Sequence, residues 1–174
     1  MSKRGIVQVY TGNGKGKTTA ALGQALRAVG HGWQVKMFQF MKGNPNYGEI
    51  QAARWLPGLV IVQCGRDEFV NADNPESVDV KLAREGLEMA RREIAGGGSD
   101  MVVLDEINVA CAFGLLETAA VLEVVRSRPP WVDLILTGRY APPEIVAVAD
   151  LVSEVQDTKH HYYQGVAARE GIEF

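Results

Sequence analysis

The chain has 174 residues, which is long enough for a substantial buried core, and nothing in it indicates a second domain. Its 18 basic and 21 acidic residues give a net charge of −3, which argues against a broad cationic surface for nucleic acid or anionic lipid. No apolar run approaches the roughly 20 residues that cross a bilayer. We therefore expect one domain over residues 1–174, with small molecules as ligands and no nucleic-acid or membrane partner.

The N-terminus and the cysteines indicate where the protein resides. The first residues, MSKRG, lead directly into an apolar run without the long apolar stretch of a signal peptide. Cys64 and Cys111 are far apart and lack zinc-type spacing, which argues against a disulfide framework and suits a reducing compartment. We expect a cytoplasmic protein in which both cysteines are packing residues.

The stretch IVQVYTGNGKGKTT, residues 6–19, is the most informative part of the chain. An apolar β-branched run enters a loop with three glycines, and the loop leads through Lys17 and Thr18 into a helical pattern. In this order, backbone N–H groups and a helix N-terminus favour phosphate, Lys17 can reach phosphate oxygens, and the Thr18 hydroxyl suits magnesium. A plain glycine-rich turn is the alternative. The predicted polyphosphate contacts are Gly12, Asn13, Gly14, Lys15, Gly16, Lys17, Thr18 and Thr19.

This loop differs from the common phosphate loop in one respect. The spacing G-x-x-x-x-G-K-[ST] requires its first glycine at position 11, which is Thr11 here, so the loop begins one residue late at Gly12. A shorter loop should hold fewer phosphate oxygens than ordinary γ-phosphoryl transfer needs, or different ones. We therefore expect the site to hold a triphosphate without hydrolysing it.

Helical and extended patterns then alternate along the chain. A helix is expected over 18–29, a strand over 34–41, a short helix over 49–55, a strand over 59–62, and a long helix from an Asn74 N-cap, with Pro75 in its first turn, to Gly96. Lys42, with Asn46 and Tyr47, follows the second strand at the edge where parallel sheets bind ligands. A solvated loop is the alternative for this segment.

The apolar run over 101–104 ends at Asp105 and Glu106. This is the Walker B pattern, in which one carboxylate holds magnesium directly or through water and a second orients a water or a ligand. Alone the pattern is weak, but downstream of a G-K-T loop it becomes strong. The predicted metal ligands are Thr18, Asp105 and Glu106, and magnesium is the expected ion, with manganese as an alternative.

The remaining residues complete an α/β pattern. Residues 107–128 read as mainly helical, a strand over 131–136 leads to Arg139, and a short helix and a last strand over 151–155 follow. Arg139 can meet phosphate or fix a carboxylate, and a surface ion pair is its alternative. The alternation predicts a P-loop NTPase-like fold, with a mostly parallel central sheet and helices on both faces. Right-handed crossovers would bring the predicted residues to one edge.

Seven fragments occur in one order over nearly the whole chain: TGNGKGKTTAALG, RAVGHG, QFMKG, VVLDEIN, ILTGR, ADLVSEV and KHxYxxGVxAxxGIEF. In these the chain resembles the ATP:corrinoid adenosyltransferases of the CobA/BtuR/CobO type. The resemblance implies that a cobalt(I) corrinoid attacks the 5′ carbon of ATP and releases inorganic triphosphate. It also implies a nucleotide in reversed orientation across the shortened loop.

The resemblance also implies roles for individual residues and partners. Lys17, Thr18 and Glu106 would be catalytic by stabilising the leaving triphosphate, and Arg27, in RAVG, would contact the nucleotide. Phe69 is the candidate for an aromatic wall over the corrin. An electron donor that reduces cobalt and a second copy in a homodimer are the implied partners.

The chain departs from the family in two places, and two other functions compete. It has GRDEF around Phe69 where many members carry G-F-T-W, and only five residues precede its first strand, where some members have an extension that covers a partner's active site.

A P-loop kinase or ATPase would also explain the Walker elements. A carrier that delivers a corrinoid to another enzyme is the non-enzymatic alternative.

Overall fold

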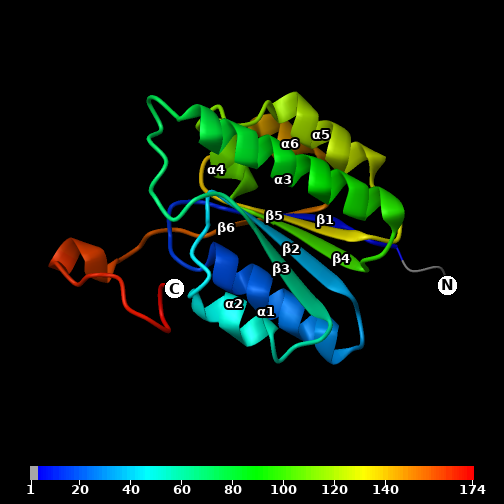
Figure 1. Ribbon diagram of the computed structural model, residues 1–174, viewed down its shortest axis with the longest axis horizontal. Helices are drawn as coiled ribbons and strands as arrows, with labels where there is room; N and C mark the ends of the chain where they lie inside the picture. Colours follow the sequence, from blue (N-terminus) through cyan, green and yellow to red (C-terminus); the bar gives the residue numbers. More distant parts are fainter. Residues whose placement is uncertain (1–3) are drawn as a thin grey trace.

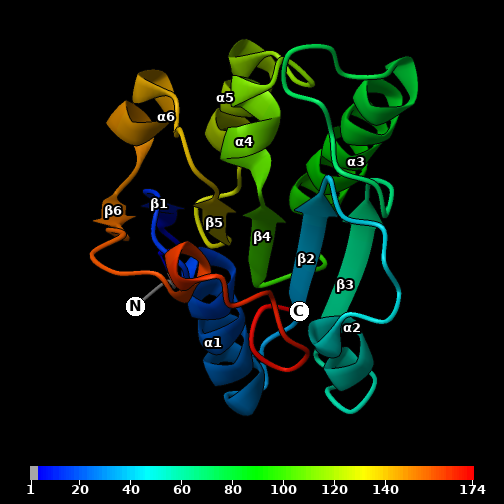
Figure 2. The same ribbon diagram turned by 90° about the vertical axis from the view of Figure 1, so that its left-hand side faces the viewer.

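A computed structural model describes residues 4–174, and the first three residues, on which the expectation about a signal peptide partly rests, lie outside the described chain. Its centre is one sheet of six parallel strands in the order β3-β2-β4-β5-β1-β6 (Figure 2). The strands are β1 (Val7–Thr11), β2 (Val35–Phe40), β3 (Leu59–Cys64), β4 (Met101–Asp105), β5 (Asp133–Thr137) and β6 (Leu151–Glu154). The predicted α/β fold is confirmed.

Helices cover both faces of this sheet (Figure 1). α1 (Lys17–Gly30) and α2 (Gly48–Ala53) lie on one face. The other face carries α3 (Ser77–Gly96), α4 (Ile107–Ala112), α5 (Thr118–Ser127) and α6 (Pro143–Val148). A short 3-10 helix, η1 (His161–Gln164), follows β6 and leads into the C-terminal residues.

The burial of the strands follows their sequences. β4 and β5 lie in the middle of the sheet and are buried at every position, as continuous apolar runs in parallel sheets require. β6 is an edge strand and is exposed at every position, although it pairs with β1. Within residues 4–174, no helix is both long and apolar enough to cross a membrane.

One detail of the helix predictions was wrong, and another segment contains a break. Residues 107–128 are mainly helical as expected, but the helix is interrupted after α4, where Gly114 has a φ of 70° and its N–H closes a turn on Cys111. The N-cap of α3 is Glu76 and not Asn74, so Pro75 precedes the helix. Glu76 and Asp79 cap each other's backbone N–H groups reciprocally, which satisfies two donors at the start of the helix.

Both cysteines are free and take part in packing. Cys64 is buried, and burial raises the pKa of its thiol to about 12. Cys111 is partly buried against the same core, and burial raises its pKa to about 11. Thiols with such raised pKa values are poorly reactive, which fits the predicted structural role.

Candidate active site

The loops that follow β1, β2, β4 and β5 surround a cavity of about 790 Å³ at the carboxyl edge of the sheet. Its lining includes most of the phosphate loop, apolar side chains of α1 and α2, and the end of the chain. The predicted residues in this lining are Gly14, Lys15, Gly16, Lys17, Thr18, Thr19, Lys42, Glu106 and Arg139. The topology therefore brings together residues that are up to 125 positions apart in the chain, from Gly14 to Arg139.

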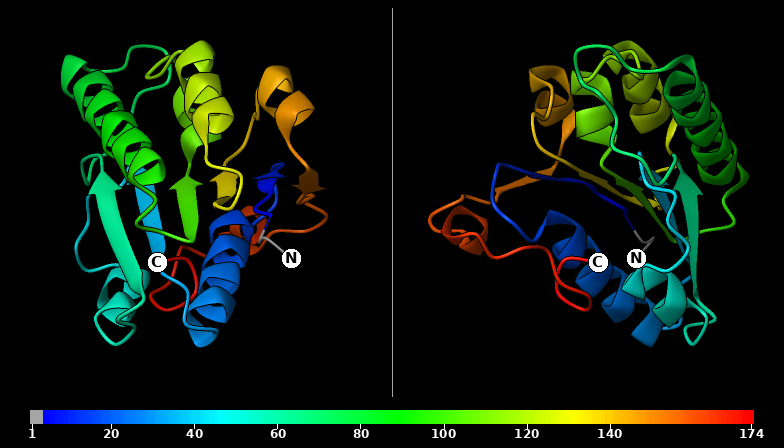
Figure 3. Two further views of the ribbon diagram at one scale, coloured as in Figure 1. Left: turned by 90° about the vertical axis from the view of Figure 1, so that its right-hand side faces the viewer. Right: turned by 60° about the vertical axis from the view of Figure 1, so that its left-hand side comes forward.

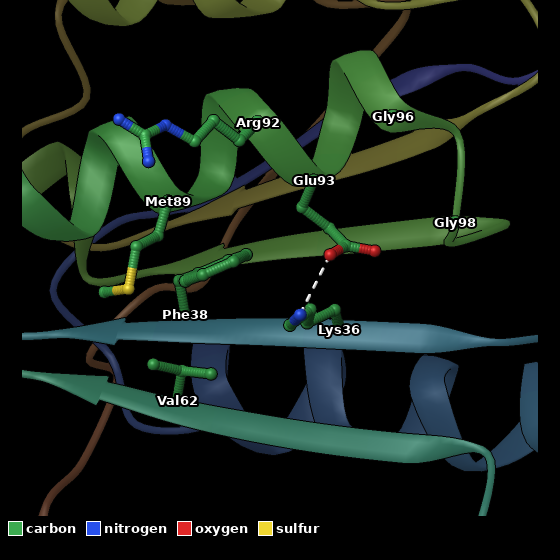
Figure 4. Close-up of a pocket in the computed structure, with 8 residues that line it drawn as sticks. All are labelled: Lys36, Phe38, Val62, Met89, Arg92, Glu93, Gly96 and Gly98. Carbon is green, nitrogen blue, oxygen red and sulfur yellow. Dashed lines mark hydrogen bonds and ion pairs between the residues drawn. The ribbon is translucent and has the colours of Figure 1, made fainter.

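A second cavity, of about 390 Å³, lies between α3 and strands β2 and β3 (Figure 4). Lys36 and Glu93 face each other across it in an ion pair of 2.8 Å. Lys36 stands near the amino end of β2, whereas ligands of open parallel sheets bind beyond the carboxyl ends of the strands. The candidate active site is therefore the larger cavity.

The phosphate loop has the backbone that its glycines predict. Gly12 has a φ of 92° and Gly16 a φ of 120°, values that L side chains rarely adopt. Gly16 is the N-cap of α1, so the helix N-terminus points its free N–H groups into the cavity. Lys17, only 6% exposed, folds back so that its Nζ donates to the Gly14 carbonyl at 2.7 Å.

The segment after β6 supports this loop from one side. The Gly14 N–H donates to the Val155 carbonyl at 2.8 Å. A Cβ on Gly12 would stand 2.4 Å from the same carbonyl oxygen, and a Cβ on Gly14 would stand 2.5 Å from the Gln156 oxygen. These two glycines are thus required by the close approach of a second segment, in addition to any ligand.

Asp105 lies at the centre of a buried polar network. The Thr18 and Thr137 hydroxyls donate to its Oδ1 at 2.8 and 2.7 Å, and Lys42 Nζ donates to its Oδ2 at 2.7 Å. Asp105 itself is fully buried, so these donors replace the water that a free carboxylate would need. Burial lowers the pKa of Lys42, but the Asp105 carboxylate outweighs this effect and leaves it above the ordinary value.

Glu106, unlike its neighbour Asp105, lines the cavity. It has a φ of 60°, unusual for a residue other than glycine, and its N–H donates to the Thr137 hydroxyl at 3.0 Å. Burial and the neighbouring Asp105 raise the pKa of Glu106, with Lys42, Lys17 and Arg139 acting in the opposite direction. The left-handed backbone therefore holds an acid with a raised pKa at the cavity wall, as functional sites often do.

Cations converge opposite these acids. Burial lowers the pKa of Lys17, while Glu106 raises it and Arg139 lowers it. Lys17, Glu106 and Arg139 all line the same cavity, although they come from three different parts of the chain. A polyanion that enters it meets two cations and a helix N-terminus.

Apart from the turn after β2, five predicted residues stand outside the cavity lining: Gly12, Asn13, Arg27, Phe69 and the buried Asp105. Gly12 and Asn13 belong to the loop but do not face the cavity, and Arg27 is exposed on α1. Phe69 is fully exposed in the connection between β3 and α3. Of the turn residues after β2, Tyr47 lines the cavity and Asn46 does not.

Several residues of the site were not predicted from the sequence. Thr137 connects Asp105 to the Glu106 backbone, and Gln39 donates to Glu49 at 2.9 Å on the cavity wall. The C-terminal residues Gly171, Ile172, Glu173 and Phe174 form another part of the wall. A polar residue at the end of a buried strand, as in ILT at 135–137, was an available signal for Thr137.

The sequence was compared with known protein families and with individual proteins. Residues 3–174 match the family described as ATP:corrinoid adenosyltransferase BtuR/CobO/CobP. This chain belongs to that family. A corrinoid adenosyltransferase from Escherichia coli K12 is 41% identical over 173 residues, covering 99% of this chain and 87% of that protein. Corrinoid adenosyltransferase CobA of Salmonella typhimurium is 38% identical, with the same shares covered. A corrinoid adenosyltransferase of Pseudomonas aeruginosa is 36% identical, covering 99% of this chain and 85% of the relative.

Proposed function

We propose that this member of the family uses the main cavity to transfer the 5′-deoxyadenosyl group of ATP to the cobalt(I) of a corrinoid. The cobalt(I) electron pair forms the new cobalt–carbon bond, and the C5′–O bond breaks. Its electron pair leaves with inorganic triphosphate, so no proton has to be removed. The observation that carries the proposal is the phosphate loop itself, shortened by one residue and set opposite Glu106 in a chain of this family.

The residues of the site then act on the leaving group. Lys17, the free N–H groups of α1 and Arg139 face the same cavity and stabilise the charge that develops on the triphosphate. Lys17 is already desolvated and nearly fixed in place, so little reorganisation is needed when the nucleotide binds. Binding also aligns C5′ with the cobalt of the corrinoid substrate. Cobalt(I) is a strong nucleophile, so the reaction depends on this alignment and not on a general base.

The cavity wall also fits magnesium. Magnesium is commonly held by one or two protein oxygens together with substrate phosphates. Thr18 and Glu106 both present oxygens to the cavity and would hold the ion, which would supply positive charge next to the triphosphate. Both oxygens of Asp105 already accept hydrogen bonds, so we assign Asp105 the task of orienting Thr18 and Lys42.

The proposal extends to partners and location. The reaction consumes cobalt(I), so an electron donor must supply it, and the free thiols of Cys64 and Cys111 suit a reducing cytoplasm. One domain over 1–174 and a homodimer remain predictions. So do the nucleotide contact of Arg27 and the corrin contact of Phe69, whose full exposure leaves it free to receive a ligand.

The products distinguish this reaction from the alternatives. ATP, magnesium and chemically reduced cobalamin should yield inorganic triphosphate and adenosylated corrinoid in equal amounts, which phosphorus NMR and the visible spectrum measure. Without corrinoid there should be little turnover. ADP formed independently of corrinoid would establish a P-loop ATPase instead, and corrinoid binding without any product would establish a carrier.

A further inference from the structure

Thr11 stands where the common phosphate loop has its first glycine, and its side chain has a partner in the structure. The Thr11 hydroxyl oxygen accepts a hydrogen bond from the Ala141 N–H at 3.3 Å, across 130 positions of the chain. Ala141 lies in the turn that follows β5. A glycine has no hydroxyl, so a loop with the common spacing cannot make this contact. The replacement of the glycine therefore ties the start of the phosphate loop to a second loop of the site.

That second loop, residues 138–141, is called the Arg139 turn below. β5 pairs with β1 in parallel, so the Arg139 turn and the phosphate loop leave the sheet side by side, with α1 on one face of the sheet and α6 on the other (Figure 3). The Arg139 side chain is exposed and lines the main cavity. Among residues 4–174, no carboxylate forms an ion pair with its guanidinium. The charge is thus available to an anion, and the backbone of the turn decides where it stands.

The backbone of the Arg139 turn is held at both ends. Gly138 has a φ of 126° and Tyr140 a φ of 60°, and such conformations persist only where the surroundings fix them. At the start of the turn, the Gly138 N–H donates to the Tyr10 carbonyl at 3.1 Å, and the buried Asn108 side chain donates to the Gly138 carbonyl at 3.3 Å. At the end of the turn, the Thr11 hydroxyl is the contact. It is the one of these contacts that a side chain of the phosphate loop supplies.

We propose that Thr11 is a positioning residue for Arg139, whose hydroxyl fixes the spacing between the Arg139 turn and the phosphate loop. Lys17 and the N-terminus of α1 face an anion in the cavity from the loop, and Arg139 faces it from the neighbouring strand end. Cations on two separate loops bind one anion well only if the loops keep their spacing, because rearrangement on binding costs affinity. The inference rests on the proposed function only in that a triphosphate occupies this cavity.

The test is a double-mutant cycle of Thr11→Val and Arg139→Ala in the full chain. The measured quantity is the Kd of inorganic triphosphate with magnesium and without corrinoid. Valine keeps the branched shape of threonine and lacks the hydroxyl. Thr11→Val should raise the Kd about three- to tenfold, and Arg139→Ala about tenfold or more. On the Arg139→Ala background, Thr11→Val should raise the Kd less than about twofold, because no guanidinium is left to position.

Two further variants separate the hydroxyl from general effects on the loop. Thr11→Ser retains the hydroxyl and should bind triphosphate within about twofold of the natural protein. Thr158→Val makes the same chemical change at an exposed threonine after β6 and should bind triphosphate normally. Weak binding by Thr11→Ser, equal to that of Thr11→Val, would mean that the methyl packing of this residue matters and its hydroxyl does not.

Three other results would overturn the assignment. A Thr11→Val effect of the same size with and without Arg139 would show that the hydroxyl supports only the fold of the phosphate loop. Unchanged binding by Thr11→Val would show that the contact has no part in holding the anion, and unchanged binding by Arg139→Ala would remove the group to be positioned. A protein that shows the predicted coupling on triphosphate but forms no adenosylated corrinoid would refute the proposed function and support this inference.

Discussion

Lys17 is the residue whose charge the reaction most directly requires. Its ammonium is buried beside the phosphate loop, where charge contacts are stronger than in water. Lys17→Ala should therefore lose about 3 kcal/mol of transition-state stabilisation, which is roughly a hundredfold in kcat. Lys81→Ala, an exposed lysine of α3, is the control and should keep its activity. Steady-state assays with ATP at saturation measure both, and near-normal turnover of the Lys17 variant would refute the assignment.

Glu106 shows that the site costs stability. Its pKa is raised in the folded protein, so the charged form is disfavoured there relative to the unfolded chain. This loss of folding free energy is absent below about pH 4, where the Glu106 carboxyl is protonated in both the folded and the unfolded chain. It grows as the pH rises through the pKa of Glu106 in the unfolded chain and then through its higher pKa in the folded protein.

Glu106→Gln should consequently be more stable than the natural protein at pH 7 and less active. Thermal unfolding should show a Tm higher by roughly 2–4 °C, about 1 kcal/mol for a chain of this size. The difference should disappear as the pH falls toward 4. A Tm gain that stays the same at pH 7 and pH 4 would mean that packing, and not charge, is responsible.

At the scale of elements, the phosphate loop depends on its contact with the residues after β6. Gly12→Ala places a methyl group against the Val155 carbonyl and strains a φ of 92°, so the loop must move. We expect nucleotide affinity to fall at least tenfold and stability to fall by roughly 1–3 kcal/mol. Gly30→Ala, at the end of α1, meets no atom within 4 Å and should leave both unchanged. Denaturant unfolding and nucleotide titration measure the pair, and an unaffected Gly12 variant would show that the loop tolerates the contact.

This loop also shows what the sequence could predict. Local patterns carry their own signal, so the first strand, the glycine loop and the helix after it were predicted correctly, as was the position of Asp105 at the end of a buried strand. Contacts between segments that are distant in the chain leave no such signal in the local sequence. The hydroxyl of Thr137 and the carbonyl of Val155 act through positions that only the order of strands in the sheet decides.

The wrong prediction of where α3 begins has a similar physical origin. Asn74 before Pro75 is a reasonable N-cap pattern, but Asp79 could cap the helix at Glu76 and also bind Arg66 at 2.9 Å. Two interactions on one carboxylate outweigh a local preference. Arg66 lies in the GRDEF segment, so the same ion pair holds the loop that carries Phe69 at the edge of α3.

On the scale of the whole molecule, the site is completed by the end of the chain returning to its beginning. Residues 165–174, the tail of the chain, contact the phosphate loop through Lys15 and the turn after β2 through Tyr47, and most of them are exposed. Few buried contacts hold such a segment, so it should open locally far more often than the sheet unfolds. Opening exposes the bond after Arg169 to trypsin.

ATP should suppress this opening if it binds between the tail and the loop. A ligand at a hundred times its Kd that binds only the assembled site stabilises it by about 2.7 kcal/mol, which reduces the open population about a hundredfold. Cleavage in the tail should slow accordingly when cleavage follows the open population, and mass spectrometry of timed digests identifies the bonds. Inorganic triphosphate lacks the nucleoside, so it offers the tail fewer contacts than ATP and should protect it less. Equal cleavage rates with and without saturating ATP would show that the tail is not a wall of the occupied site.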